Sequence, residues 1–272
     1  MKHYLPMLAS PMKGTIIHSE WVAEEKYDGH RILVRVANGV VSAVSRDLLP
    51  RVLPAQIHHP MACMPDGVYD GELLVPGKRS YGVTELTNQE KLQYFIFDLI
   101  ESNGIGMCHL TYEDRRMALT YAYDHALRGS SWAVHLASVY PCISAEQLTG
   151  LVGTMWAEDK EGLIIKKKTS QYTPGRRSKE WIKLKALRSD VLTIVGFQAG
   201  KNGPYSTVVL ADGSPHNGIL GRTTVKTKNM VELDRLAQNP DSFIGRQLRI
   251  EYQERTPDGN YRHPRWDRFE DE

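Results

Sequence analysis

The sequence predicts an α+β protein of two domains, with mixed strands and helices in a larger N-terminal part and mainly strands in a small C-terminal part. The chain has 272 residues, which is near the size at which one hydrophobic core gives way to two. Strand-like and helix-like segments alternate up to about residue 168. After residue 188, short strand-like segments are joined by Gly, Pro, Asn and Asp turns.

Turn and alternation signals define the strands of the first domain. Asn38-Gly39 is typical of a tight hairpin turn, and Ile32, Val34 and Val36 before it fall on one face. The segments GVYDGELLV, KLQYFIFDLI and GLIIKKK are rich in strand-forming residues. The expected strands are residues 31–36, 40–44, 67–75, 91–100 and 162–168.

Capping residues define two helices between these strands. The first covers residues 111–127 and has Thr111 at its N-cap. The second covers 144–157, where Ser144 and Gln147 form a capping-box pattern. The buried positions expected along the first helix are Leu110, Met117 and Leu119.

The C-terminal part suits a small closed barrel of the OB type. Its expected strands lie at 191–197, 205–213, 221–227 and within 246–266, and one helix at 229–238 ends before Pro240. We therefore expect domains at residues 1–187 and 188–272.

Composition excludes several classes of protein. Hydrophobic residues make up 41% and charged residues 24% of the chain, as in ordinary globular proteins. No apolar run is long enough for a membrane span, and prolines interrupt the N-terminal MKHYLPMLASP. The three cysteines fit neither a disulfide framework nor a CxxC-type zinc site. We expect a cytoplasmic protein with no membrane partner.

Basic residues are concentrated between Lys166 and Arg188, where nine stand against one acid, Glu180. Part of this run is the segment WIKLK. Strand alternation there would direct Lys183 and Lys185 to one face and Ile182 to the other. Two ammonium groups on one face repel each other, so they suggest an anion between them, such as a nucleotide phosphate or a nucleic-acid backbone.

Six motifs follow one another in a fixed order along the chain. They are KYDGHR (26–31), SRD (45–47), DGE (70–72), FIFDLI (95–100), EGLIIK (161–166) and WIKLK (181–185). Together they resemble the motifs of the covalent nucleotidyltransferases, most closely the ATP-dependent DNA ligases. PMLASP, IFDLIESNG and EYQERTPDGNYRHPRW are also similar to ligase sequences, so the resemblance extends over nearly the whole chain.

The resemblance implies a fold and a reaction. The fold is a nucleotidyltransferase, ATP-grasp-like adenylation domain with antiparallel sheets and packed helices, followed by the OB barrel. In the reaction, the amine of Lys26 attacks the α-phosphate of ATP and pyrophosphate leaves. The adenylate then passes to the 5′-phosphate of a DNA nick, and the 3′-hydroxyl displaces AMP. The attacking amine has to be uncharged, so we expect Arg31, Lys183, Lys185 and a bound metal close to Lys26.

The resemblance also implies roles for individual residues. Glu24 would bind the adenine amino group, Phe97 would stack on the purine, and Arg31 and Glu72 would bind the ribose. Mg²⁺, or Mn²⁺ in its place, would be held by Glu161 and Glu72. The remaining catalytic and phosphate-binding candidates are Asp28, Lys183 and Lys185.

Further residues would contact DNA and pyrophosphate. Nicked duplex DNA would meet Arg46, Lys167, Lys168, Arg176, Arg177 and Lys179, and pyrophosphate would be oriented by Arg262, Arg265 and Arg268. Arg46 would also belong to the residues that bind the nucleotide. The sequence departs from the family pattern at Leu48, where a glycine is common, and at Glu270, where an arginine is often found. Because Lys26 lies near the start, we expect the minimal ligase layout of viruses and bacteria, working as a monomer in a bacterial or virus-infected cell.

Two kinds of alternative remain open, and a third is excluded. An RNA ligase or an mRNA-capping guanylyltransferase would use the same kind of lysine. A non-catalytic protein that binds nicks or single strands could retain a decayed nucleotidyltransferase domain beside an OB module. A NAD-dependent ligase would need a four-cysteine zinc site, which three cysteines cannot supply.

Overall fold

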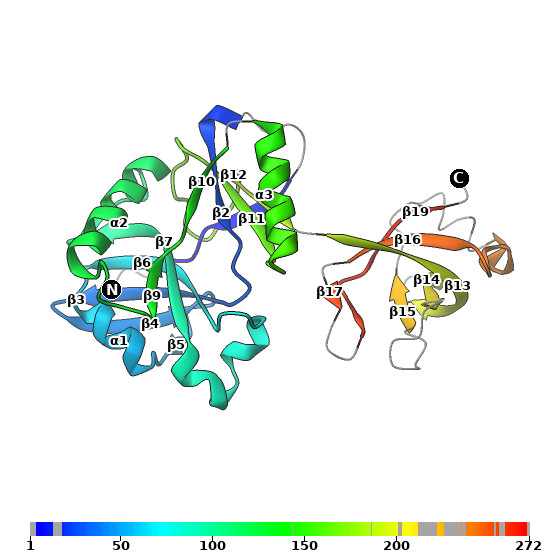
Figure 1. Ribbon diagram of the computed structural model, residues 1–272, viewed down its shortest axis with the longest axis horizontal. Coiled ribbons are helices and arrows are strands. Elements are labelled where there is room, and N and C mark those ends of the chain that lie inside the picture. The colour runs from blue at the N-terminus through cyan, green and yellow to red at the C-terminus, as the bar shows by residue number, and fades with distance from the viewer. Residues whose placement is uncertain are drawn as a thin grey trace. The chain divides into compact units, whose positions relative to one another are not determined.

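A computed structural model gives the architecture of the chain (Figure 1). It describes residues 4–12, 18–142, 144–185, 187–200, 203–211, 222–225, 235, 238–252, 254–255 and 259–270. The chain divides into two compact units, Met1–Ala186 and Leu187–Glu272. The division follows Ala186, whereas the sequence places it after Leu187.

The larger sheet of the first unit is almost entirely antiparallel. Its strand order is β5-β4-β3-β6-β7-β8, and β9 pairs with β7 in parallel. The bounds are β3 His30–Ala37, β4 Val40–Ser45, β5 Pro50–Arg51, β6 Gly67–Leu74, β7 Gln93–Ser102, β8 Ile105–Gly106 and β9 Val134–Leu136.

The hairpin between β3 and β4 has the turn that the sequence predicts. Asn38 and Gly39 have φ values of 51° and 73°, and two left-handed central residues match the right-handed twist of the flanking strands. Ile32, Val34 and Val36 are at most 1% exposed. The prediction of their shared buried face is therefore confirmed.

Three α-helices accompany the sheets in the described part of the first unit: α1 Ala55–Ala62, α2 Tyr112–Ala126 and α3 Ala145–Ala157. The expected caps are present, since the Thr111 hydroxyl accepts from the Asp114 N–H and the Ser144 hydroxyl from the Gln147 N–H, each at 3.2 Å. Short 3₁₀ turns occupy His18–Glu20, Ser80–Val83 and Leu86–Lys91 in this unit and Pro240–Phe243 in the second.

One expectation for α2 was wrong, and α1 was not expected. Leu119 is fully buried and Leu110 packs against the core, but Met117 is 68% exposed. Met117 lies midway between the buried Arg115 and Leu119, so a 3.6-residue period turns it to the opposite side. Helix α1 is short and contains Pro60, which is why its sequence gives no clear helical signal.

The smaller sheet of the first unit has the order β1-β12-β11-β2-β10. Its strands are β1 Leu8–Pro11, β2 Trp21–Glu25, β10 Val139–Cys142, β11 Gly162–Lys167 and β12 Arg177–Lys185. Helix α3 packs against it through Leu148 and Met155. Met7, Leu33 and Trp181 belong to a cluster that joins this sheet to the larger one.

The second unit is an antiparallel sheet in its described part, with the order β15-β14-β13-β16-β19 beside a short pair of β17 and β18. The bounds are β13 Arg188–Gly200, β14 Gly203–Ala211, β15 Arg222–Val225, β16 Gln247–Tyr252, β17 Glu254–Arg255, β18 Tyr261–Arg262 and β19 Arg265–Phe269. The helix expected at 229–238 lies outside the described residues except for Arg235 and Gln238. Among the described residues of the chain, no helix has the length and apolar character needed to cross a membrane.

Candidate active site

A cleft between the two sheets of the first unit gathers most of the expected site residues. Strands from both sheets and the segments next to them contribute its lining. The expected residues that line it are Glu24, Lys26, Arg31, Arg46, Glu72, Phe97, Arg177 and Lys183. The cleft therefore combines carboxylates, cations and an aromatic ring that lie far apart in the sequence.

Lys26 lies directly after β2 and is tied at both its backbone and its side chain. Its N–H donates to the Gly162 carbonyl at 2.8 Å, and its Nζ donates to Oε2 of Glu161. The other oxygen of Glu161 lies 3.2 Å from Nζ of Lys185. A single carboxylate therefore lies between two ammonium groups.

The turn after Lys26 depends on Gly29. A Cβ atom at this position would lie 2.3 Å from the carbonyl oxygen of Leu73, so the backbone there leaves no room for a side chain. Asp28 lies 4.0 Å from Arg79, which also pairs with Asp159 at 3.0 Å. These contacts give Asp28 and Gly29 a structural function in this turn.

Strand β12 presents its lysines as the alternation predicts. Trp181 and Lys183 line the cleft, while Ile182 packs into the core beneath α3. Burial and the neighbouring cations, Lys185 and Arg177 foremost, lower the pKa of Lys183. This concentration of positive charge suits an anionic ligand.

Arg31 is held by a carboxylate that sequence reasoning did not single out. Its guanidinium donates to Asp70 at 2.9 and 2.6 Å and lies 5.0 Å from the centre of the Phe97 ring. Asp70 belongs to the DGE motif and is completely buried. This burial, which only the structure shows, indicates that its carboxylate needs a charged partner such as Arg31. Glu72, on the same strand, is the register partner of Arg31. Burial raises the pKa of Glu72 to about 8 despite the opposing effect of Arg31.

Glu24 belongs to a second polar group in the cleft. Its carboxylate accepts a hydrogen bond from the Tyr112 hydroxyl and pairs with Nζ of Lys166 at 2.7 Å. Lys166 is 1% exposed, and its ammonium lies 4.1 Å from the centre of the Trp181 ring. Burial lowers the pKa of Lys166, although Glu24 opposes this. Sequence reasoning placed Lys166 in the basic run and at the end of the EGLIIK motif but gave it no role of its own, because nothing local marks it as buried.

Trp181 has a further feature that sequence reasoning missed. Its buried indole N–H has no hydrogen-bond partner among the described residues. Since Trp181 lines the cleft, this orphaned donor fits a site that takes a polar ligand.

The residues expected to bind DNA occupy different environments. Arg176 and Lys179 are exposed, and Lys167 lies 4.0 Å from Glu180. Arg177 donates to the Ala9 carbonyl and lines the cleft, and Lys168 is half-buried.

Arg46 is exposed in the turn after β4 and also lines the cleft. Leu48, two residues further, has a φ of 61°. This left-handed conformation is unusual for leucine and explains why a glycine is favoured there.

The three arginines expected to orient pyrophosphate all belong to the second unit. Arg262 lies on β18, and Arg265 and Arg268 lie on β19. Arg268 pairs with Asp267 at 3.3 Å. Glu270 accepts from Arg249 at 2.9 Å, so this departure from the family pattern has a local ion-pair partner.

The described residues contain no cluster of three His, Cys, Asp or Glu side chains that could hold a metal by themselves. Mg²⁺ is usually bound by one or two carboxylates together with substrate phosphates and water. The carboxylate of Glu161 beside Lys26 fits that smaller ligand set.

The first unit therefore combines two facing sheets with a cleft in which Lys26, an aromatic ring, cations and carboxylates lie together. The sequence profile of the ATP-dependent DNA ligase domain matches residues 6–185. The chain belongs to the ATP-dependent DNA ligase domain family.

Individual relatives agree with this assignment. Over 215 residues the chain is 29% identical to the multifunctional non-homologous end joining DNA repair protein LigD of Mycobacterium tuberculosis, a match that covers 75% of the chain and 26% of LigD. Over 223 residues it is 24% identical to the DNA ligase of Methanothrix thermoacetophila, covering 74% of the chain and 39% of that ligase. The chain thus spans only part of the length of these relatives.

Solved structures share the fold. The ligase structure named Pmar-Lig_PreS3 has a TM-score of 0.76 at 16% identity, covering 99% of this chain and 68% of that one. A Lig E DNA ligase has a TM-score of 0.70 at 18% identity, covering 96% and 98%. The ligase domain of M. tuberculosis LigD has a TM-score of 0.54 at 23% identity, covering 98% and 94%.

Proposed function

We propose that the protein is an ATP- and Mg²⁺-dependent DNA ligase that seals nicks through a lysyl-AMP intermediate on Lys26. The observation that carries the proposal is the contact between the Lys26 amine and Glu161 at the edge of the cleft, with Lys183 and Lys185 on the adjoining strand. Family membership favours this function over an RNA ligase or a capping enzyme. The site residues in place favour it over a non-catalytic protein.

In the first step, Nζ of Lys26 attacks the α-phosphorus of ATP. A P–N bond forms, the P–O bond to pyrophosphate breaks, and the amine loses its proton. Oε2 of Glu161 accepts a hydrogen bond from this amine and is therefore placed to receive the proton. Lys183 and Lys185 offset the negative charge that grows on the phosphate oxygens.

In this proposal the nucleotide lies along the cleft. Phe97 stacks on the purine, Glu24 accepts from the adenine amino group, and Arg31 binds a ribose hydroxyl. Glu72, the register partner of Arg31 on the neighbouring strand, binds the ribose beside it. Glu161 is then the metal ligand, and bound Mg²⁺ would add Lewis-acid stabilisation of the phosphates.

The later steps use the same cleft. AMP moves from Lys26 to the 5′-phosphate at a nick, and the 3′-hydroxyl then displaces AMP to form the phosphodiester bond. Exposed cations of the first unit, Arg46, Arg176 and Lys179 among them, bind the DNA backbone. The second unit acts as an OB-fold barrel whose arginines orient pyrophosphate, and the protein works as a monomer.

Mass spectrometry after incubation with ATP and Mg²⁺ tests the proposal. We expect a mass gain equal to AMP on Lys26, no gain in Lys26→Ala, and an unchanged gain in Lys91→Ala, whose lysine is exposed outside the cleft. A labelled nicked duplex should be sealed by the wild type only when the adduct forms. An adduct formed with GTP alone would favour a capping enzyme, and an undiminished adduct in Lys26→Ala would falsify the nucleophile assignment.

A further inference from the structure

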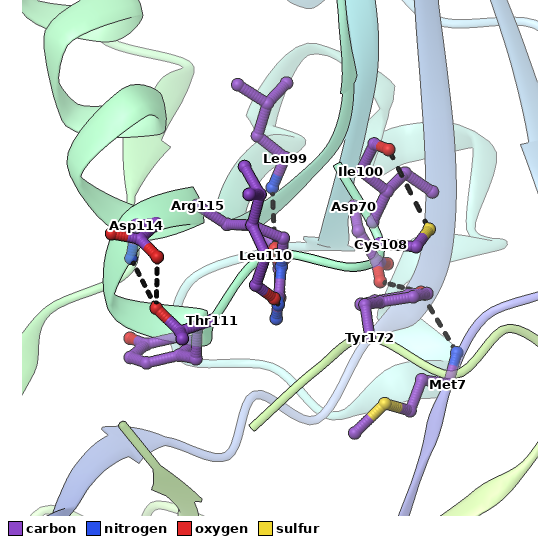
Figure 2. A network of polar contacts seen from close by, with 12 residues as sticks. Met7, Asp70, Leu99, Ile100, Cys108, Leu110, Thr111, Asp114, Arg115 and Tyr172 are labelled. Atoms are coloured by element: carbon purple, nitrogen blue, oxygen red, sulfur yellow. Dashed lines mark hydrogen bonds and ion pairs between the residues drawn. The ribbon is translucent and has the colours of Figure 1, made fainter. Parts of the chain in front are cut away.

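A buried chain of hydrogen bonds connects the N-terminal segment to Arg31. The backbone N–H of Met7 donates to the hydroxyl oxygen of Tyr172 at 3.0 Å, and that hydroxyl donates to Oδ2 of Asp70 at 2.6 Å (Figure 2). Asp70 also accepts the two hydrogen bonds from Arg31. Met7, Asp70 and Tyr172 are at most 2% exposed, so bulk water cannot replace a contact that is lost.

A hydroxyl suits the middle of this chain, because one oxygen atom makes both contacts. It accepts from the Met7 N–H and donates to Asp70 at the same time, whereas an ionised carboxylate can only accept. Burial raises the pKa of Tyr172 well above its usual range, so the hydroxyl keeps the proton that it donates. Oδ2 of Asp70 therefore accepts from both the Tyr172 hydroxyl and the Arg31 guanidinium, while Oδ1 accepts from Nε of Arg31.

Tyr172 is itself fixed by its surroundings. Its ring lies edge-on to Trp181 with the centroids 5.8 Å apart, and its N–H donates to the Cys108 carbonyl at 3.0 Å. Nearby, the N–H of Gly175 donates to the Leu5 carbonyl at 3.0 Å. The loop before β12 and the N-terminal segment are thus fastened to each other at the place where Tyr172 meets Asp70.

We propose that Tyr172 is a positioning residue of the nucleotide site, whose hydroxyl fixes Asp70 and through it the direction of the Arg31 guanidinium beside Phe97. This inference rests on the proposed function, in which Arg31 binds a ribose hydroxyl. Tyr172 touches no nucleotide in this account. Its effect reaches the substrate only because Arg31 has to point at one atom of the ribose.

The test compares Tyr172→Phe with the wild type in AMP-adduct formation from ATP, 2′-deoxy-ATP and 3′-deoxy-ATP. The wild type should prefer ATP over the analogue that lacks the hydroxyl bound by Arg31. In Tyr172→Phe this preference, measured as a ratio of kcat/KM values, should fall by about 5- to 10-fold, the effect of losing one hydrogen bond of ordinary strength. A purely structural loss would slow all three nucleotides by the same factor and leave the ratio unchanged.

Tyr69→Phe is the matched control. It removes another buried hydroxyl, which donates to the Pro65 carbonyl at 2.6 Å, and should leave the preference as in the wild type. If Tyr172→Phe does not fold, Asp70→Asn replaces it, because an amide cannot hold Arg31 as an ionised carboxylate does.

An unchanged ratio in a folded Tyr172→Phe or Asp70→Asn variant overturns the inference. A wild type that makes no distinction among the three nucleotides overturns it too, because Arg31 would then bind no ribose hydroxyl. A wild type that forms no adduct at all is a separate result. It contradicts the proposed function and removes the basis of the inference.

Discussion

Lys26 and Glu161 form a direct ion pair although 135 residues separate them in the sequence. Lys26 follows β2 and Glu161 precedes β11, and these two strands are antiparallel neighbours. The pairing of β2 with β11 therefore brings the amine and the carboxylate together. The side chains are 21% and 13% exposed, so solvent screens this ion pair only in part.

Replacing Glu161 by Gln should lower the rate of AMP-adduct formation by about 10- to 100-fold. The variant keeps the shape of the side chain but loses the charge that orients Lys26, receives its proton and binds Mg²⁺ in the proposed reaction. The adduct should also need a higher Mg²⁺ concentration. Rapid quenching with labelled ATP over a series of Mg²⁺ concentrations measures both effects. Glu158→Gln, at a half-exposed carboxylate that pairs with Lys160, is the control and should match the wild type.

Replacing Gly29 by Ala should destabilise the first unit by about 1–3 kcal/mol, because the new methyl group overlaps the backbone of Leu73. The turn between Lys26 and Arg31 would then shift, and adduct formation should fall with it.

Gly150→Ala should have the opposite effect on stability. This glycine lies within α3 and has open space around it, so alanine should stabilise the protein by about 0.5–1 kcal/mol. Urea unfolding of Gly29→Ala and Gly150→Ala measures both changes. Equal free energies of unfolding in the two variants would contradict the prediction.

The sequence predicted those parts of the fold and site that local patterns determine. The Asn38-Gly39 turn, the caps at Thr111 and Ser144, and the opposite directions of Ile182 and Lys183 all follow from residues close together in the chain. Such features need only the strand period, turn conformation or capping chemistry.

Distant contacts account for what the sequence did not predict. The burial of Lys166 is accompanied by its ion pair with Glu24, and the positioning role proposed for Tyr172 depends on Asp70, 102 residues away. No property of a lysine or a tyrosine in its own segment indicates such a partner. Helix α1 is a similar case. It is short and contains a proline, but it buries Ile57 and Met61 against the core. Tertiary packing outweighs weak propensity in that case.

The half-buried Glu72 should make stability depend on pH. Its pKa is about 8 in the folded protein against an ordinary value of 4.5, so between these values the folded chain keeps a proton that the unfolded chain releases. Stability from this group is therefore present at low pH and is lost as pH rises towards 8, at up to about 1.4 kcal/mol per pH unit. Glu72→Gln has no proton to release. Urea unfolding at pH 5, 6.5 and 8 should show the variant gaining stability relative to the wild type, whereas parallel pH curves would rule this out.

Replacing Arg176 and Lys179 together by Ala should weaken binding to nicked DNA without slowing AMP-adduct formation. Both side chains are exposed and neither lines the cleft, so we expect their charge to act on the duplex and not on the nucleotide. Each lost phosphate contact reduces the slope of log K against log salt by about 0.9, which gives a change of about two for the pair. Fluorescence anisotropy with a labelled nicked duplex between low and moderate salt measures the slope.

The control is Arg128→Ala, which removes an arginine that is 77% exposed on a different surface element. This variant should leave the salt slope unchanged. If the double variant kept the wild-type slope, Arg176 and Lys179 would not contact DNA, and the phosphates would have to be bound by the other candidate cations of the first unit or by cations of the second unit.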